Sequence, residues 1–267
     1  MKLPWLDVPA IEKIEVAAFL DLFGAAPREF ADQADLAYAS IGEGCAVSLP
    51  FAPAVGLNRV LGVRCVQDLD RALNWMQRRR GNRFLQLAEG HAKVDVLEWI
   101  AKAKLTRQEN SWVKLSRKAP DATLTWDGRI DIREATLADA PQFAKLMCSG
   151  FGFPEALWPM WAGVVERGGW RSLIAYVGDS PAGTAMMFSA GSYAWLGGGT
   201  TLHSFRNQGV QTALIRARLN LGVRDGVSTF AVETAEPQPD AARTSFDNLI
   251  REGFMHMYTR RNYRLAD

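Results

Sequence analysis

The stretch from residue 193 to residue 226 constrains the fold more than any other part of the sequence. A strand-like run, 193–202, leads into a short polar turn that contains Arg206 and Gly209. A segment with helical periodicity follows, and its predicted buried face is formed by Val210, Ala213, Leu214, Ala217 and Leu221. Three arginines are predicted to lie largely elsewhere on this helix: Arg216, Arg218 and Arg224. Gly226 is typical of a residue just beyond a helix end, so the order here is strand, tight turn, helix.

A strand followed by a tight turn and a helix N-terminus is suited to binding an anion. The first N–H groups of a helix have no partner inside it, and the helix dipole adds partial positive charge at the same place. A phosphate group satisfies both. Gly209 lacks a Cβ, so a bulky anion can approach the backbone closely, and Arg206 can add charge-assisted hydrogen bonds. The sequence therefore predicts a phosphate-binding turn.

The motifs that the turn lacks, and the one that it resembles, indicate which phosphate-containing ligand it binds. The turn has neither the Gly-Lys-Ser/Thr ending of a P-loop nor a Gly-x-Gly-x-x-Gly dinucleotide motif. Residues 206–211, Arg-Asn-Gln-Gly-Val-Gln, resemble the acyl-CoA loop of the GNAT superfamily of N-acyltransferases. That pattern is Arg or Gln, two residues, Gly, one residue, and Gly or Ala. The chain departs from it at Gln211, although Thr212 and Ala213 directly beyond are small.

Residues 130–267 as a whole have the order of elements found in this family. The patterns predict a strand at 130–134, helices at 138–149 and 154–166, strands at 173–177, 182–189 and 193–202, the helix after Gly209, a strand at 229–233, a helix at 241–251, and strands at 254–259 and 263–265. Gly253 and Phe254 are similar to the Gly-Phe pair that follows the last helix of the family. The resemblance implies an α+β GNAT fold with a central mixed, mostly antiparallel sheet flanked by helices.

Residues 1–120 show a similar but weaker succession. Helices are predicted at 11–22, 30–40, 69–80 and 93–104, and strands at 45–49, 58–63, 84–87 and 111–115. On the helix at 93–104, the predicted apolar face is Val94, Leu97 and Ile100. Because this half lacks an Arg-x-x-Gly-x-Gly/Ala loop, we interpret it as a degenerate second copy that has lost its cofactor. The expected organisation is a degenerate GNAT-like domain at 1–120, a linker at 121–129 rich in turn residues, and a GNAT acyltransferase domain at 130–267.

The resemblance also implies which residues contact acyl-CoA. N–H groups of the turn would hold the pyrophosphate, and backbone groups at the end of the preceding strand would bind the pantetheine arm much as they bind an added strand. The predicted cofactor-binding residues are Thr200, Thr201, Leu202, Arg206, Asn207, Gln208, Gly209, Val210, Gln211, Thr212 and Asn248. Two alternatives stay open. Thr200 and Thr201 can be ordinary strand residues without a role in binding, and the Asn248 side chain can point into water instead of toward the cofactor.

The family transfers an acyl group, here expected to be acetyl, directly from acyl-CoA to an amine, which must be neutral to attack. A free alkylamine has a pKa of about 10.4, so a base or a desolvating pocket is needed. Glu233 is the predicted base because it ends the strand beside the expected thioester; the alternative is a solvated carboxylate. Glu236 and Asp240 nearby can attract a cationic substrate. The position of the family's acid Tyr is Leu249. Tyr258, the first choice, and Tyr263 are possible substitutes, unless each is only a packing aromatic.

Composition excludes several other classes of protein. The chain has 31 Lys and Arg against 29 Asp and Glu, and a net charge of +2 does not indicate nucleic-acid binding by charge. The three cysteines have no metal-ligand spacing and fit a reducing compartment. Neither a signal peptide nor a membrane-spanning run is apparent. We therefore expect a cytoplasmic protein, a monomer or homodimer, that binds no metal, nucleic acid or membrane.

Three functions stay open from the sequence. The first is an acetyl-CoA-dependent N-acetyltransferase acting on a small-molecule or protein amine. The second is a CoA-binding regulatory or interaction protein without turnover, which the missing Tyr favours. The third is a structural or partner-binding protein whose turn holds no ligand.

Overall fold

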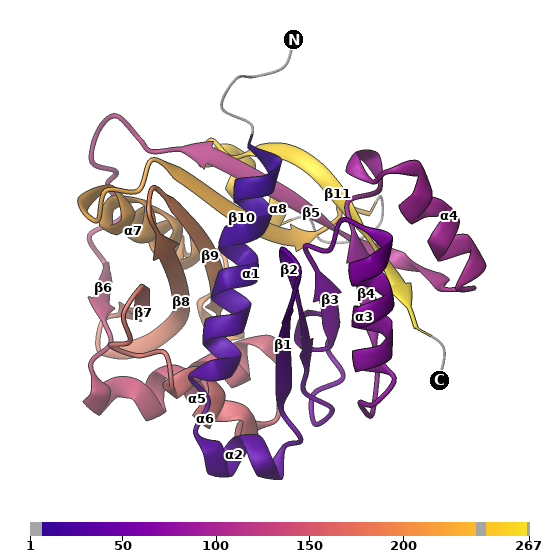
Figure 1. Ribbon diagram of the computed structural model, residues 1–267. Helices are drawn as coiled ribbons and strands as arrows, with labels where there is room; N and C mark the ends of the chain where they lie inside the picture. The colour runs from indigo at the N-terminus through magenta and orange to yellow at the C-terminus, as the bar shows by residue number, and fades with distance from the viewer. Residues whose placement is uncertain (1–6, 239–243, 266–267) are drawn as a thin grey trace.

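The computed structural model describes residues 7–238 and 244–265 of the 267-residue chain. Its strands form one continuous eleven-stranded sheet (Figure 1). The strands are β1 (Ala37–Ile41), β2 (Gly44–Ser48), β3 (Arg59–Leu61), β4 (Phe84–Leu87), β5 (Thr106–Lys118), β6 (Ile130–Glu134), β7 (Trp170–Val177), β8 (Ser180–Ala190), β9 (Tyr193–Thr201), β10 (Thr229–Ala235) and β11 (Met255–Arg264). The helices are α1 (Val8–Gly24), α2 (Arg28–Gln33), α3 (Val66–Met76), α4 (Val94–Lys102), α5 (Ala140–Phe151), α6 (Trp158–Ala162), α7 (Val210–Arg224) and α8 (Thr244–Arg251). Among the described residues, no helix combines the length and apolar character needed to cross a membrane.

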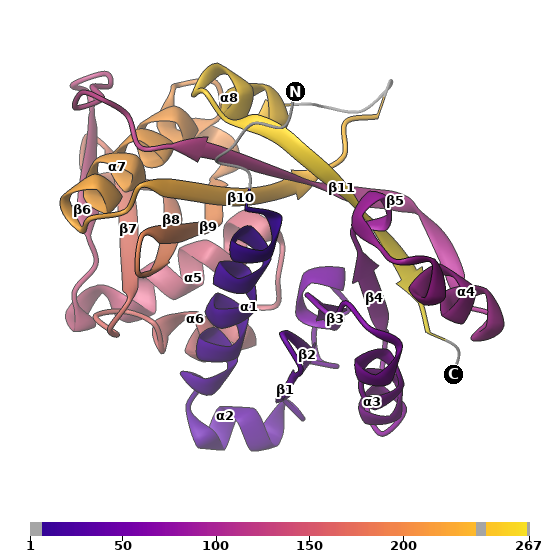
Figure 2. The same cartoon turned by 45° about the horizontal axis from the view of Figure 1, so that its top comes forward.

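The order of strands shows that the two halves of the chain exchange strands. The order is β1-β2-β3-β4-β11-β5-β10-β9-β8-β7-β6, and only the pairs β3–β4 and β9–β10 are parallel. β5, the last strand of the first half, lies between β10 and β11, while β11 lies between β4 and β5 (Figure 2). The predicted mixed, mostly antiparallel sheet is confirmed. Residues 119–129 contain no helix or strand, and the exact domain boundaries stay a prediction.

Helices cover both faces of this sheet. Alternate residues of a strand point to opposite faces, so Trp195 packs with α1, α5 and α6 on one face, whereas Leu196 packs with α7 and α8 on the other. A third apolar cluster joins α3 and α4 to the first half. α1 belongs to the first half by sequence, yet it crosses the middle of the sheet and contacts β8 and β9 as well as β2 (Figure 1). α1 and the exchanged strands therefore unite the two halves.

The prediction of one helix over residues 30–40 is wrong. α2 ends at Gln33 and β1 begins at Ala37. Asp35 between them has a φ of 51°, a left-handed conformation that an α-helix does not contain. The two strands predicted at 254–259 and 263–265 are in fact one strand, β11, with two register shifts against β5.

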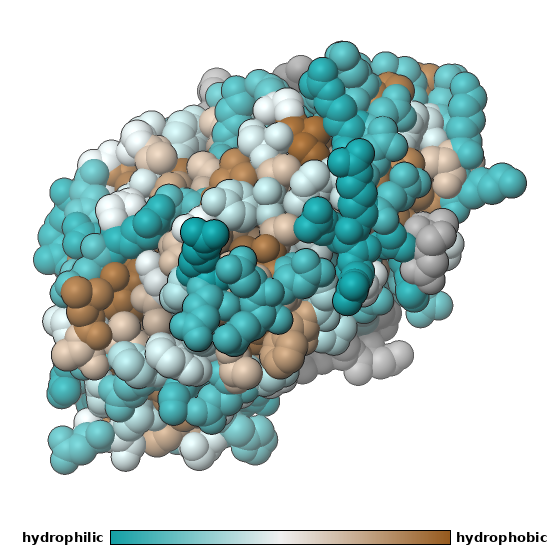
Figure 3. All heavy atoms as spheres, turned by 60° about the horizontal axis from the view of Figure 1, so that its bottom comes forward, coloured by the Kyte–Doolittle hydropathy of each residue, from teal (hydrophilic) through white to brown (hydrophobic). Residues whose placement is uncertain are grey.

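The face of the molecule in Figure 3 is largely polar, with apolar side chains scattered among the hydrophilic ones. On α4, Val94 is 72% and Leu97 is 41% exposed, while Val96 and Ile100 are buried. The apolar face predicted for this helix is therefore wrong at two of its three positions. α4 packs through Val96 and Ile100 in the cluster that it shares with α3.

Candidate active site

β9 and β10 start as a parallel pair and then part. Their pairing ends at Leu196 of β9 and Val232 of β10, although β9 continues to Thr201 and β10 continues to Ala235. Backbone groups of both strands are therefore not paired with one another at this end of the sheet. The parting lies directly before the turn that leads from β9 into α7.

The turn presents the start of α7 as the sequence predicts. Gly209 is the residue before the helix and has a φ of 84°, and Asn207 is also left-handed, with a φ of 62°. The N–H of Ala213 donates to the Gly209 carbonyl over 3.0 Å. The N–H groups of residues 210–212 precede this first helical bond, so they have no partner within the helix. No side chain caps this helix start among the described residues.

A cleft of about 1110 Å³ lies along this turn and the parted strands. Nine of the eleven predicted cofactor-binding residues line it: Thr200, Thr201, Arg206, Asn207, Gly209, Val210, Gln211, Thr212 and Asn248. The remaining walls come from the end of α5, residues 109–111 of β5, the end of β10 with the residues after it, and α8. Two predicted residues do not line the cleft. The Leu202 N–H donates to the Ala182 carbonyl (2.9 Å), and the Gln208 side chain donates to the Ser204 carbonyl (3.1 Å).

Gln211, where the family pattern has a small residue, is tied to α8. Its side-chain amide donates to the Ser245 hydroxyl over 3.3 Å and accepts a hydrogen bond from the Asn248 amide. Asn248 in turn accepts a hydrogen bond from Arg251. The longer side chain therefore braces α7 against α8, and the Asn248 side chain already has two protein partners beside the cleft.

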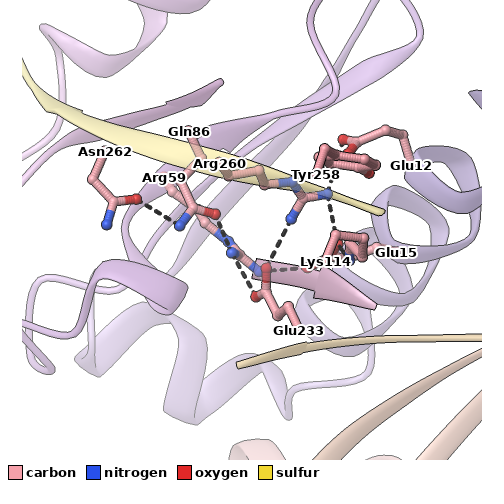
Figure 4. A network of polar contacts seen from close by, with 9 residues as sticks. All are labelled: Glu12, Glu15, Arg59, Gln86, Lys114, Glu233, Tyr258, Arg260 and Asn262. Carbon is pink, nitrogen blue, oxygen red and sulfur yellow. Dashed lines mark hydrogen bonds and ion pairs between the residues drawn. The ribbon is translucent and has the colours of Figure 1, made fainter. Parts of the chain in front are cut away.

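Glu233, the predicted base, does not line the cleft but lies in a buried network of charges (Figure 4). One carboxylate oxygen accepts a hydrogen bond from Arg59 and the other accepts one from Arg260, each over 2.8 Å. Glu233 could take an amine proton only by weakening these two ion pairs. The structure makes the Glu233 carboxylate an ion-pair partner of two buried arginines, and its role as the base stays a prediction that this geometry does not favour. Asp240 lies outside the described residues.

Tyr258, the predicted acid, points into the same network. Its hydroxyl donates to Glu12 of α1, and burial together with the Glu12 charge raises the pKa of Tyr258 far above its ordinary value. The next residue, Thr259, points the other way, and its hydroxyl lies 3.4 Å from the carboxylate of Glu236 at the cleft. Successive strand residues face opposite sides, so Tyr258 is turned away from the cleft. This orientation does not favour Tyr258 as the acid, and that role stays a prediction.

The buried network joins the two halves of the chain. Its charged members are three cations and three carboxylates: Arg59, Lys114, Arg260, Glu12, Glu15 and Glu233. Glu15 is fully buried; one of its oxygens lies 3.0 Å from Arg59, and the other contacts Lys114 and lies 2.7 Å from Arg260. Burial by itself raises the pKa of Glu15, but the charges of these three cations outweigh it and hold the pKa well below 4.5. The network therefore depends on an ionised Glu15.

Arg218 of α7 is the functional candidate that the sequence patterns missed. Only 4% of its surface is exposed, and its guanidinium donates to the carbonyls of Leu214 (3.0 Å), Met186 (3.1 Å) and Gly197 (3.2 Å). Burial lowers the pKa of Arg218 to about 9, which leaves it charged at neutral pH. A sequence signal was present, because Arg218 follows the buried Leu214 by four residues and so shares its helix face.

Comparisons with known proteins match the fold and not the sequence. No family model and no curated protein matches this chain. A GCN5-related N-acetyltransferase from Kribbella flavida matches with a TM-score of 0.62 over 96% of each chain, at 14% identity. A tandem GNAT protein from the clavulanic acid biosynthesis pathway matches with a TM-score of 0.61 over 97% of this chain and 93% of its own, at 17% identity. A GCN5-related N-acetyltransferase from Sphaerobacter thermophilus matches with a TM-score of 0.59 over 83% of this chain and 79% of its own, at 13% identity.

These matches define the fold of the chain as that of the GCN5-related N-acetyltransferases, the GNAT fold. The fold predicted from the sequence is confirmed. One of the matched structures is a tandem protein that this chain covers almost completely.

Proposed function

We propose that the protein is an N-acyltransferase that moves an acetyl group from acetyl-CoA to an amine. The observation that carries this proposal is the start of α7, where N–H groups without a helical partner line the cleft beside the parted strands β9 and β10. A diphosphate fits such a helix start, because the amides donate to it and the helix dipole favours its charge. Because Gly209 has no Cβ, the diphosphate can come close to these backbone amides. The parted strands offer backbone groups to an extended pantetheine arm.

The reaction needs an amine held against the thioester. The amine nitrogen attacks the carbonyl carbon, the C–N bond forms, and the C–S bond breaks with release of the thiolate, while the amine loses its proton. Among the residues that the structure describes, two carboxylates line the cleft, on Glu109 and Glu236. Glu236 is held by the Ser111 hydroxyl (2.5 Å) and by Arg261 (2.7 Å). Glu109 has no ion-pair partner in the described part of the chain, so we propose that it attracts a cationic acceptor.

Glu109→Gln is expected to raise the KM for a cationic amine about three- to fivefold and to leave the KM for acetyl-CoA unchanged. An exposed charge pair contributes up to about 1 kcal/mol, and 1.4 kcal/mol corresponds to a factor of ten. Steady-state kinetics at low and high salt checks this, because salt screens the exposed charge and should narrow the difference. Glu98→Gln, on the exposed surface of α4, is the matched control and should change neither KM. An equal change in both variants would contradict the role of Glu109.

Arg206→Met is expected to weaken the binding of CoA about tenfold. Arg206 is exposed at the cleft, and a hydrogen bond to a charged group contributes about 1.5–3 kcal/mol. Calorimetric titration with CoA measures the loss. Pantetheine, which has no phosphate, is the control ligand and should bind both proteins alike. A similar loss for the two ligands would show that Arg206 does not contact phosphate.

The decisive experiment for the proposed function measures release of free thiol from acetyl-CoA with a panel of small-molecule amines and amine-bearing peptides. Amine-dependent release supports acyl transfer. Binding of CoA without release for any amine favours a CoA-binding protein without turnover, the alternative that the missing Tyr supports. If CoA well above micromolar concentration does not raise the melting temperature, the turn holds no CoA and a structural role is favoured.

A further inference from the structure

β9 contains a bulge at Gly198 and Gly199, within the part of the strand that has left β10. The register with β8 shifts between Thr184 and Met186, so the single residue Ala185 lies opposite both glycines and neither has a regular partner on β8. Their other edge has no strand partner either, because the pairing of β9 with β10 ends before them. Gly198 has a φ of 56°, which favours glycine. The bulge therefore needs support from outside the sheet.

Arg218 supplies that support from the α7 side. Its carbonyl acceptors on Met186 and Gly197 belong to the last residue pair before the bulge. A Cβ built on Gly199 would lie 3.4 Å from Nη2 of Arg218, and Gly199 itself lines the cleft. Nη2 makes no hydrogen bond to any residue that the structure describes. The charged guanidinium of Arg218, a buried residue, thus lies directly behind the cleft wall.

The charge of Arg218 is not balanced by a nearby acid. No carboxylate among residues 7–238 and 244–265 forms an ion pair with it, and burial is the sole cause of its lowered pKa. The buried arginines of the central network each contact at least two carboxylates. Desolvating a charge without a counter-ion is costly. Packing alone would therefore favour an apolar residue at this position.

We infer that Arg218 is a positioning residue for acyl transfer, which holds the Gly198–Gly199 bulge in shape and places positive charge behind the reacting thioester. This inference rests on the proposed function. When the C–N bond forms, the carbonyl π electrons move to oxygen; when the C–S bond breaks, they return and sulfur leaves as thiolate, with the amine proton passing to water. Negative charge therefore develops twice beside the bulge, and a fixed cation in a water-poor site stabilises it without reorganisation.

The test compares three substitutions at Arg218 with one control on the same helix. Arg218→Lys keeps the charge, Arg218→Gln keeps donors without the charge, and Arg218→Met removes both. Arg216→Met is the control, because it breaks an ion pair with Glu252 away from the bulge. Thiol release with an accepted amine gives kcat and the KM for acetyl-CoA, and circular dichroism and the melting temperature report folding.

We expect Arg218→Gln and Arg218→Met to lower kcat about 10- to 100-fold, with the KM for acetyl-CoA changed less than about threefold. Arg218→Lys should keep at least about a third of kcat, and Arg216→Met should keep all of it. A folded Arg218→Gln protein with the kcat of the unchanged protein would overturn the inference. Failure of all three variants to fold would also overturn it, since Arg218 would then serve folding. Lack of turnover by the unchanged protein with every amine would instead overturn the proposed function, and the inference with it.

Discussion

Gly209→Asp is expected to weaken CoA binding at least about 100-fold while the protein stays folded. Gly209 lines the cleft immediately before α7, and its amide neighbours face the place where we propose the diphosphate binds. A carboxylate there would occupy the amides and repel the ligand's charge. Losing two charge-assisted hydrogen bonds of about 1.5–3 kcal/mol each corresponds to a factor of 100 or more. Calorimetric titration with CoA measures the change.

Gly209→Asn is the matched control for this substitution. The residue has a φ of 84°, and Asp and Asn are the two non-glycine residues that best tolerate this left-handed region. Asn has the size of Asp without its charge, so it should cost no more than about tenfold in affinity. Melting temperatures of the two variants should agree within a few degrees. If the two bind CoA equally well, the anion site is not at the start of α7.

Glu15→Gln is expected to lower the free energy of unfolding by about 3–5 kcal/mol. Glu15 lies fully buried among Arg59, Lys114 and Arg260, and removing one partner of a buried ion pair leaves uncompensated charge behind. Urea denaturation at pH 7 measures the loss. Glu43→Gln breaks the exposed pair with Lys13 and should lower the free energy of unfolding far less than Glu15→Gln, because water screens that pair. Equal losses for the two variants would show that the buried network does not stabilise the fold.

Comparing the unchanged protein with Glu15→Gln at several pH values provides a second test. The folded pKa of Glu15 lies well below its ordinary value of 4.5. A depressed carboxyl pKa stabilises the protein above the unfolded pKa, and the stabilisation disappears as pH falls through the folded pKa. The difference in unfolding free energy between the unchanged protein and Glu15→Gln should therefore stay constant from pH 8 to about pH 5 and narrow below about pH 4. A difference that narrows already between pH 8 and pH 6 would contradict this.

Adding Lys114→Met to Glu15→Gln tests whether the network acts through charge balance. The double variant removes one cation together with one carboxylate, so it leaves fewer uncompensated charges than Glu15→Gln alone. We expect its loss of stability to be smaller than the sum of the two single losses by at least about 1 kcal/mol. Additive losses would show that the two residues act independently.

Local patterns in the sequence predict most helices and strands. They fail where contacts with distant elements decide whether a side chain is buried. All five residues predicted for the buried face of α7 are buried. Arg218 is buried beside them, because carbonyls of β8 and β9 accept its hydrogen bonds; periodicity treats every arginine as a surface residue. On α4, Val94 and Leu97 are exposed because α3 meets the neighbouring face of that helix. The strand β1 was missed because its residues alternate only weakly between exposed and buried positions.

Sequence patterns miss the surroundings of the predicted catalytic residues for a different reason. Glu233 lies two residues before the end of β10, and its carboxylate meets Arg59, a residue 174 positions away in the sequence. Tyr258 is turned to α1, and Ser111 of the first half supplies a cleft wall beside Glu236. Each of these contacts exists because β5 and β11 cross between the halves. Spacing along the chain contains no information about such an exchange.

The sequence alone predicts the strand, the left-handed glycine turn and the unpaired helix amides at the start of α7, because these are neighbours along the chain, and on them it bases the expectation of an anion site. Their geometry follows from local backbone chemistry. Only the tertiary structure decides which side chains surround that element, which carboxylates are consumed in the buried network, and that Arg218 supports the bulge of β9. The physical reason is that these contacts depend on strand order and on the face to which each strand residue points, and both are set by packing between distant segments.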